Sequence, residues 1–196
     1  MADRLHLSPR LPQARANDTM FHTTVQILDV ETKKIRSLSQ NEGGESAPRW
    51  SPDRTQIAFL YSPEGYGQKD LYVIATEGGT PAKCTDAYDR NVDTPIWSPD
   101  GETIYFCGRD GAQRHFYAVP EKGGEIRKIT EGDCVIGEIS IGDNTFLCTR
   151  SAPNAPGDLW IGSIRSGLRK QITKLNPQLD DFALGEVRVI QWQSSD

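Results

Sequence analysis

The sequence predicts an all-β fold, and three observations support that prediction. A ten-residue phrase occurs twice, as WSPDRTQIAF at 50–59 and as WSPDGETIYF at 97–106. Apolar and polar residues alternate with a period of two around both copies, which is typical of half-buried strands. Short runs rich in β-branched and aromatic residues are separated by Gly-Gly, Ser-Gly and Ser-Pro-Asp turns. Repetition of this kind indicates a fold built from recurring units.

Each repeat contains four predicted strands. In the copy over 93–130, the first strand ends at TPIW, Ser-Pro-Asp-Gly makes a tight turn, and TIYFC, HFYAVP and EIRKIT follow. The copy over 47–85 has the same order, and the copy over 135–173 keeps the strands but lacks Trp-Ser-Pro-Asp. Half a copy, at 23–39, precedes them. The residues that close the four units recur every 43 to 46 positions: Ser39, Thr85, Thr130 and Thr173.

Four short antiparallel strands in every 43 to 46 residues are typical of a β-propeller blade. We therefore predict a partial β-propeller of about three and a half four-stranded antiparallel blades, arranged as an open arc. An immunoglobulin-like sandwich also has short strands, but they do not recur as a four-strand cassette. A parallel β-helix has much shorter coils. Because propellers close with typically about four to eight blades, we expect this chain to be a fragment, part of a longer polypeptide, or paired with another copy.

The two ends of the chain differ from the repeats. Residues 1–22 contain two prolines and no apolar signal-peptide core, so we expect a flexible N-terminal tail. In 174–196, Asn176-Pro177 is a typical start of a helix, and we expect a short helical turn there. The alternating segment EVRVIQW at 186–192 then predicts one more strand.

The composition excludes several function classes. The net charge is −5, positive and negative residues are interspersed, and no basic block is present, so we expect neither a nucleic-acid nor a membrane partner. No apolar run approaches the roughly 20 residues needed to span a bilayer. With no recognisable signal peptide, the cytoplasm is the expected compartment. Free thiols are expected at the four cysteines, which lack metal-binding spacing: Cys84, Cys107, Cys134 and Cys148.

The repeated phrase, the Gly-Gly turns and the "R-x-I/L-T" ends of the repeats resemble a known group of propellers. The sequence is similar to the β-propeller repeats shared by TolB-like proteins and by the prolyl oligopeptidase family of serine peptidases. Two departures are present: Arg54 replaces the turn glycine of the first copy, and the third copy lacks the Trp-Ser-Pro-Asp signature.

The C-terminal segment resembles one branch of that group more closely. Ile172-Thr173, Asn176-Pro177-Gln178-Leu179, Gly185-Glu186 and Trp192 are similar to the junction at which acylaminoacyl-peptidases and dipeptidyl-peptidases leave the propeller and enter the α/β-hydrolase domain. The resemblance implies that 174–196 leads toward a hydrolase domain that is missing from this chain. It also implies that the propeller limits access to short peptide substrates.

Catalytic residues are not expected in this chain. An α/β-hydrolase needs a G-x-S-x-G elbow, an acid and then a histidine in chain order, and no G-x-S-x-G is present. The nearest segment, 44–48 (GESAP), has a proline in place of the last glycine. We also expect no metal and no cofactor, since the acidic residues of the connecting loops lack the spacing of a Ca²⁺ loop: Asp86, Asp89, Asp93, Glu131 and Asp133.

One face of the predicted propeller is the best candidate for contact with a substrate or partner. The loops between second and third strands lie on the same face as the loops that join successive blades, and loops on rigid scaffolds often carry function. Arginine and tyrosine are favoured contact residues. The candidates on these loops are Tyr66, Tyr88, Arg90, Arg109, Arg114 and Arg150, with Lys69 beside them.

Two other functions stay open from the sequence. A TolB-like module that binds other proteins, with no enzyme attached, would have the same repeats. A purely structural segment that completes its ring with a second chain would also be compatible with them.

Overall fold

The computed structural model describes residues 4–9, 22–190 and 192–193, of which 4–9 are described as backbone only. These residues are almost entirely β-strand and connecting loop, and the one helical element is the short 3-10 helix η1 (Pro177–Asp181). No helix in the described ranges is long and apolar enough to cross a membrane. The all-β prediction is confirmed.

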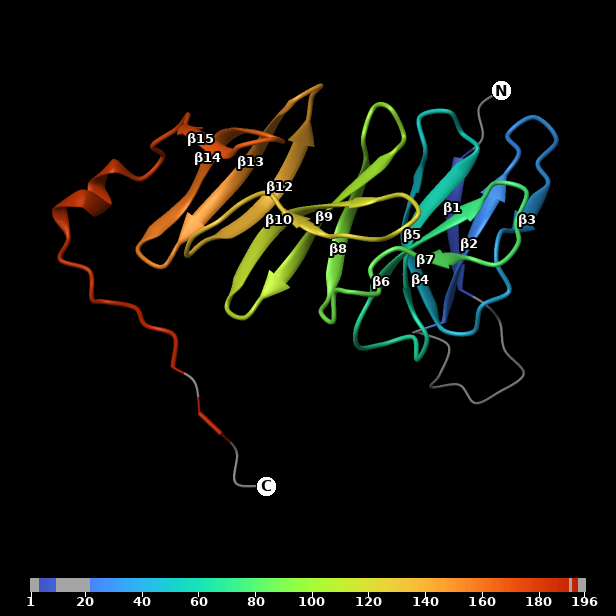
Figure 1. Cartoon of the computed structure of the whole chain (residues 1–196), viewed down its shortest axis with the longest axis horizontal. Coiled ribbons are helices and arrows are strands. Elements are labelled where there is room, and N and C mark those ends of the chain that lie inside the picture. Colours follow the sequence, from blue (N-terminus) through green and yellow to red (C-terminus); the bar gives the residue numbers. More distant parts are fainter. Residues whose placement is uncertain (1–3, 10–21, 191, 194–196) are drawn as a thin grey trace. The chain divides into compact units, whose positions relative to one another are not determined.

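The strands form three complete blades and a leading incomplete one (Figure 1). The leading blade contains β1 (Arg4–Pro9), β2 (Thr23–Leu28) and β3 (Ile35–Ser37). The first full blade contains β4 (Gly44–Trp50), β5 (Gln56–Ser62), β6 (Asp70–Ala75) and β7 (Ala82–Lys83). The second contains β8 (Val92–Trp97), β9 (Thr103–Asp110), β10 (Gln113–Pro120) and β11 (Arg127–Lys128). The third contains β12 (Val135–Ile141), β13 (Thr145–Ala152), β14 (Ala155–Ser163) and β15 (Gly167–Gln171).

Hydrogen bonding joins the blades in pairs, which produces two mixed sheets. One sheet has seven strands, with β1-β2-β4-β5-β6-β7 in order and β3 beside β2. The other has eight, with β15-β14-β13-β12-β10-β9-β8 in order and β11 beside β10. Within blades the pairing is antiparallel, whereas the short β2–β4 and β10–β12 ladders are parallel. The end strands of the described order do not pair with each other in either sheet, so both sheets are open.

The chain divides into two compact units, one of residues 1–108 and 117–127 and one of residues 109–116 and 128–196. The division runs through the β9–β10 hairpin of the second full blade. In the first unit, one hydrophobic cluster joins the first and second full blades and includes Leu60, Val73 and Phe106, and another joins the leading blade to the first full blade and includes Val25 and Phe59. In the second unit, the rings of Phe116 and Phe146 lie 5.1 Å apart between centroids.

The repeated Ser-Pro-Asp turns have the same geometry in both copies. Ser51 Oγ donates to Asp53 Oδ1 at 2.6 Å, and Ser98 Oγ donates to Asp100 Oδ1 at 2.5 Å. The fourth residue of each turn has a positive φ, +77° at Gly101 and +61° at Arg54. Glycine adopts that conformation without a steric penalty, whereas a residue with a Cβ does not. The substitution at Arg54 is therefore strained but does not change the turn.

A threonine closes each full blade by a hydrogen-bonded clasp onto its third strand. In the first full blade, Thr85 Oγ1 accepts a bond from Leu71 N at 3.1 Å and donates to Asp70 Oδ1 at 3.3 Å. Lys83 Nζ lies 3.0 Å from the other carboxylate oxygen of Asp70. Since the clasp ties the loop after the fourth strand to the beginning of the third, it holds the edge of the blade in place.

The third full blade has the same clasp. Thr173 Oγ1 accepts from Leu159 N at 2.9 Å and donates to Asp158 Oδ1 at 2.8 Å. In the second full blade, Thr130 Oγ1 accepts from Phe116 N at 3.0 Å, but its side-chain partner is His115.

The leading blade uses a different device. Its closing residue, Ser39, donates to the carboxylate of Glu45, and Glu45 Oε2 accepts from Val25 N at 2.7 Å. Asn41 Nδ2 adds a third bond, 3.0 Å to Glu45 Oε1. Glu45 is fully buried, and these three donors satisfy its carboxylate. A side chain of β4 therefore closes the preceding blade.

Two predictions for the ends of the chain are wrong in part. The predicted tail over 1–22 contains strand β1, because Arg4–Pro9 pair in antiparallel register with β2; residues 10–21 lie outside the described part. The predicted strand over 186–192 is not formed by the described residues, which Figure 1 shows as coil after η1. Val187, Val189 and Ile190 are exposed there. Alternation alone did not produce a strand, since the main-chain groups need a pairing partner.

Candidate functional site

The six predicted contact residues are divided equally between the two units. In the first unit, Tyr66 is exposed on the β5–β6 loop, where its main-chain oxygen accepts from Ser62 Oγ at 2.6 Å. Arg90 is exposed on the loop before β8. Tyr88 is instead half-buried, with its ring 5.5 Å from Phe106 and 5.2 Å from Tyr117. The Tyr88 ring therefore packs against the core of the first unit.

The three arginines of the second unit have different roles. Arg109 is exposed at the end of β9. The guanidinium of Arg114 donates through Nη1 to the main-chain oxygen of Ile136, so it ties β10 to β12. Arg150 is half-buried, and its guanidinium carbon lies 4.9 Å from the ring centroid of Trp160. Of the three, Arg109 has the most accessible side chain for an external ligand.

A pocket of about 670 Å³ lies at the loop end of the second unit. Two of its lining residues, Gln113 and Ser151, are chain neighbours of Arg114 and Arg150. Its wall is largely apolar, with one acidic residue and one arginine among the lining residues, as expected for a small-molecule or peptide site. The residues that line it include Asp133, Val135, Ala152, Pro153, Val187 and Arg188. The sequence analysis did not find this pocket, because its wall combines segments that are far apart in the chain.

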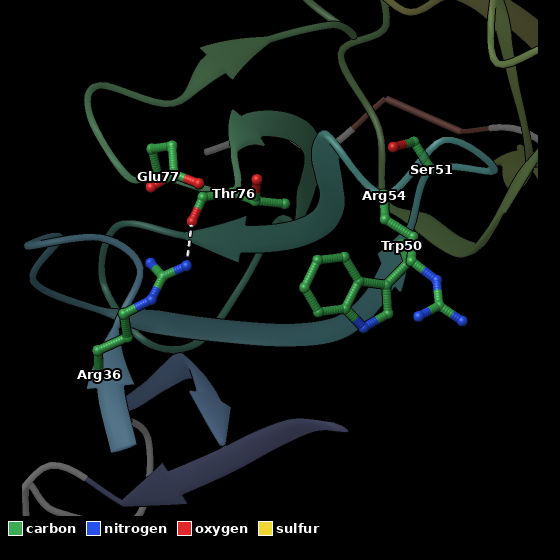
Figure 2. Close-up of a pocket in the computed structure, with 6 residues that line it drawn as sticks. All are labelled: Arg36, Trp50, Ser51, Arg54, Thr76 and Glu77. Carbon is green, nitrogen blue, oxygen red and sulfur yellow. Dashed lines mark hydrogen bonds between the residues drawn. The ribbon is translucent and has the colours of Figure 1, made fainter. Parts of the chain in front are cut away.

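A smaller pocket of about 320 Å³ lies at the opposite end of the first full blade, beside the Ser-Pro-Asp turn (Figure 2). Figure 2 shows the Trp50 indole between the side chains of Arg36 and Arg54. Arg36 Nη2 donates to the main-chain oxygen of Thr76 at 2.5 Å, which ties β3 to the end of β6. Because Arg36 is already engaged and the two guanidinium groups do not converge in this view, we assign this pocket no ligand.

The described histidines are not placed for acid–base catalysis. His22 Nδ1 accepts a hydrogen bond from Gly43 N at 3.1 Å, and His115 is fully buried in the clasp of its blade. His6 lies in the strand of which only the backbone is described. No group of three metal-ligating side chains comes together within the described ranges. The described residues therefore offer surfaces and pockets for contact, and the hydroxyl that His115 contacts, that of Thr130, is buried with it.

Comparison with known proteins agrees with the propeller fold. The sequence profile described as TolB beta propeller domain matches residues 19–176. The chain belongs to the TolB beta propeller domain family. This propeller is 26% identical over 164 residues to dipeptidyl-peptidase 5 of Porphyromonas gingivalis, a match that covers 82% of the chain and 24% of that protein. It is also 38% identical over 94 residues to the uncharacterized peptidase YuxL of Bacillus subtilis, covering 47% of the chain and 14% of the relative.

Solved structures show the same fold. The propeller superposes on acylaminoacyl peptidase of Pyrococcus horikoshii with a TM-score of 0.74 and 17% identity, over 98% of this chain and 29% of that one. The β-propeller domain of the Trilobed protease from Pyrococcus furiosus gives 0.69 at 17% identity, over 89% and 52% of the two chains. The chain thus matches about a quarter of the length of dipeptidyl-peptidase 5, and it is a propeller related to those of peptidases.

Proposed function

We propose that this chain is the non-catalytic, substrate-gating propeller of a serine peptidase that acts on short peptides, with the catalytic α/β-hydrolase domain supplied by further sequence. The observation that carries the proposal is the relationship to dipeptidyl-peptidase 5, which extends over 82% of the chain. The absence of G-x-S-x-G from the sequence supports assigning the nucleophile elsewhere.

The physical role in this proposal is exclusion and contact. A propeller placed over an active site excludes folded proteins by size, and its loops meet the peptides that pass. The pocket lined by Gln113 and Asp133 supports contact at the loop end, since its wall is largely apolar and includes charged residues. Arg109, at the end of β9, and Arg188, which lines the pocket, are both exposed cations of this unit. An acidic or carboxy-terminal group of a peptide is the chemistry that such a guanidinium would bind.

The first test is the coding sequence that follows Asp196. About 250 further residues with G-x-S-x-G, Asp and then His, the extent typical of a domain, would support the proposal. A stop codon with no hydrolase sequence would contradict it.

The second test is activity. The purified 196-residue chain should neither hydrolyse dipeptidyl and acyl-peptide chromogenic substrates nor react with a serine-directed phosphonate, whereas the chain joined to its hydrolase domain should do both. In that longer protein, Arg109→Ala should raise KM for short peptides more than Arg165→Ala, an exposed arginine in the β14–β15 turn at the opposite end of a blade. Equal increases in KM for the two variants would show that the loop end of the blade does not contact the substrate.

A second candidate function is a TolB-like module that binds other proteins. The family match itself favours it, and TolB from Acinetobacter baumannii superposes with a TM-score of 0.64 at 16% identity over 78% of the chain. The two candidates differ in whether a hydrolase sequence follows, so the coding sequence decides between them.

A further inference from the structure

The second full blade carries a histidine at the position where the other two full blades carry an aspartate. His115 lies 15 residues before its closing threonine, as Asp70 and Asp158 do before theirs. Its ring Nδ1 lies 3.3 Å from Thr130 Oγ1, the same contact that the two aspartates make through Oδ1. The second full blade therefore has a histidine where the other full blades have an aspartate, and the ordinary pKa of histidine is higher than that of aspartate.

The hydrogen bonds around His115 suit its neutral form. Thr130 Oγ1 accepts from Phe116 N at 3.0 Å, so the hydroxyl proton is available for Nδ1. Nε2 then carries the ring proton, and it donates to Gln113 Oε1 at 2.9 Å. Both ring nitrogens are satisfied without a charge. Protonation at Nδ1 would deprive the threonine hydroxyl of its acceptor and place a cation at a fully buried site.

The charged groups that face the ring come from β9, β11 and the loop after β11. Lys128 Nζ lies 3.1 Å from Asp110 Oδ2 and 3.5 Å from Glu131 Oε2. Both carboxylates are thus paired with the lysine rather than with the imidazole. Asp133 accepts from the side-chain amide of Gln113. No carboxylate in this set is hydrogen-bonded to the ring.

These surroundings determine the direction of the pKa shift. Burial first, and then the charge of Lys128, lower the pKa of the His115 imidazole below its ordinary value of 6.5, while Glu131, Asp110 and Asp133 oppose the shift. If the hydrogen bond between His115 and Thr130 breaks, the ring reaches water. The imidazole in this opened clasp binds a proton at a higher pH than the imidazole in the closed clasp.

His115 also adjoins the connection between two blades. The next residue toward the N-terminus, Arg114, donates through its main-chain N to Cys134 O at 3.2 Å and through its guanidinium to Ile136 O. On the other side, Phe116 O accepts from Ile129 N at 2.8 Å. The beginning of β10 thus holds both its own blade edge and β12. Release of His115 would loosen both.

We propose that His115 makes the second full blade an acid-sensitive joint: protonation opens the Thr130 clasp and frees the start of β10 from β12. The closed clasp is fully stable above about pH 7 and weakens as the pH falls below 6.5, because the opened state takes up the proton first. The clasp of Asp158 responds only at lower pH, since the pKa of that carboxyl is lowered from 3.8. Between about pH 5 and 6.5, the clasp of the second blade is therefore expected to weaken while the Asp158 clasp stays closed.

Hydrogen exchange of the full chain at pH 7.5 and 5.5, corrected for the intrinsic rate at each pH, tests this proposal. Peptides that cover 113–120 and 127–136 should show an opening equilibrium that increases up to about tenfold at the lower pH. Peptides that cover 155–175, which contain the Asp158 clasp, are the internal control and should change little. A uniform increase in both regions, or no increase in either, would overturn the proposal.

His115→Asn is the matched variant, because an amide oxygen in the position of Nδ1 accepts from Thr130 and does not titrate. His115→Asn should fold, and the opening equilibrium of residues 113–120 should no longer depend on pH. His115→Asp should form the same aspartate–threonine clasp as the other two full blades. If His115→Asn retained the tenfold increase in the opening equilibrium, a group other than His115 would be the cause of that increase. Should neither variant fold, an NMR titration of the His115 ring in the unaltered chain decides: a pKa at or above 6.5 overturns the proposal, and one below it supports it.

Discussion

The indole Nε1 of Trp97 donates a hydrogen bond to the main-chain oxygen of Arg49, 3.0 Å away, so the last residue of β8 is tied to β4 of the preceding blade. The Trp97 side chain is 9% exposed and belongs to the core of the first unit. Since Trp97 comes from the repeated phrase, that phrase supplies both a turn and the contact that stacks one blade on the next.

Replacing Trp97 with alanine should therefore destabilise the protein by about 3–5 kcal/mol, because a large aromatic side chain is lost from a packed core. Trp97→Phe, which keeps a ring and loses the Nε1 donor, should cost less. Denaturant unfolding followed by circular dichroism measures both. Trp192→Ala is the control, since that side chain is 83% exposed and its loss should change the free energy of unfolding by less than about 0.5 kcal/mol. An unchanged midpoint for Trp97→Ala would show that the contact between these blades is not as described.

The turn at Arg54 predicts a stabilising substitution. Arg54→Gly should stabilise the protein by about 1 kcal/mol, because glycine adopts the positive φ of this position without the penalty of a Cβ. Gly101→Arg is the matched reverse change at the equivalent turn and should destabilise by a similar amount. Thermal unfolding of the two variants should move in opposite directions. Movement in the same direction would mean that contacts of the arginine side chain outweigh the backbone strain.

The Asp158 clasp predicts a pH dependence on the acid side. Hydrogen bonds from Leu175 N, at 2.9 Å, and from the Thr173 hydroxyl lower the pKa of the Asp158 carboxyl below 3.8. Its stabilising effect is therefore full above about pH 5 and is lost as the pH falls from 3.8 through the lower, folded-state pKa. The free energy of unfolding should differ between the wild type and Asp158→Asn at pH 6, and the difference should shrink toward pH 3. A difference that stays constant over that range would show that the charge of Asp158 has no role in the clasp.

The cysteines should be unreactive in the folded chain. All four are buried thiols outside disulfides, and burial raises the pKa of the Cys84 thiol to about 12 and that of Cys148 to about 11. Cys84 Sγ also donates to Glu121 O at 3.1 Å. An aromatic disulfide reagent at pH 8 should react slowly until denaturant is added, since the thiolate is the reactive form. Thr80→Cys, at an exposed position, provides a fast-reacting reference. Rapid modification of a native cysteine would indicate that its blade opens.

Short-range signals account for most of the fold prediction. The turn around Ser98 and Asp100 was predictable because its hydrogen bonds join residues within five positions of each other. Its repetition, with strands of period two, was enough to predict blades. The spacing of the closing residues was also visible, but their bonds were not: Thr85 reaches Asp70 only after two strands have paired.

The sequence by itself determined the strands, the turns and the blade repeat, since these depend on residues close together in the chain. Only the tertiary structure decided which elements found partners. Arg4–Pro9 became a strand because β2 offered an edge, while residues 186–190, which also alternate, met no partner strand and are coil. It also decided that Tyr88 packs against the core, that Glu45 closes its neighbour's blade, and that His115 replaces a carboxylate. Each of these outcomes depends on which groups are buried together, and burial determines the energy of a polar group more strongly than its place in the sequence.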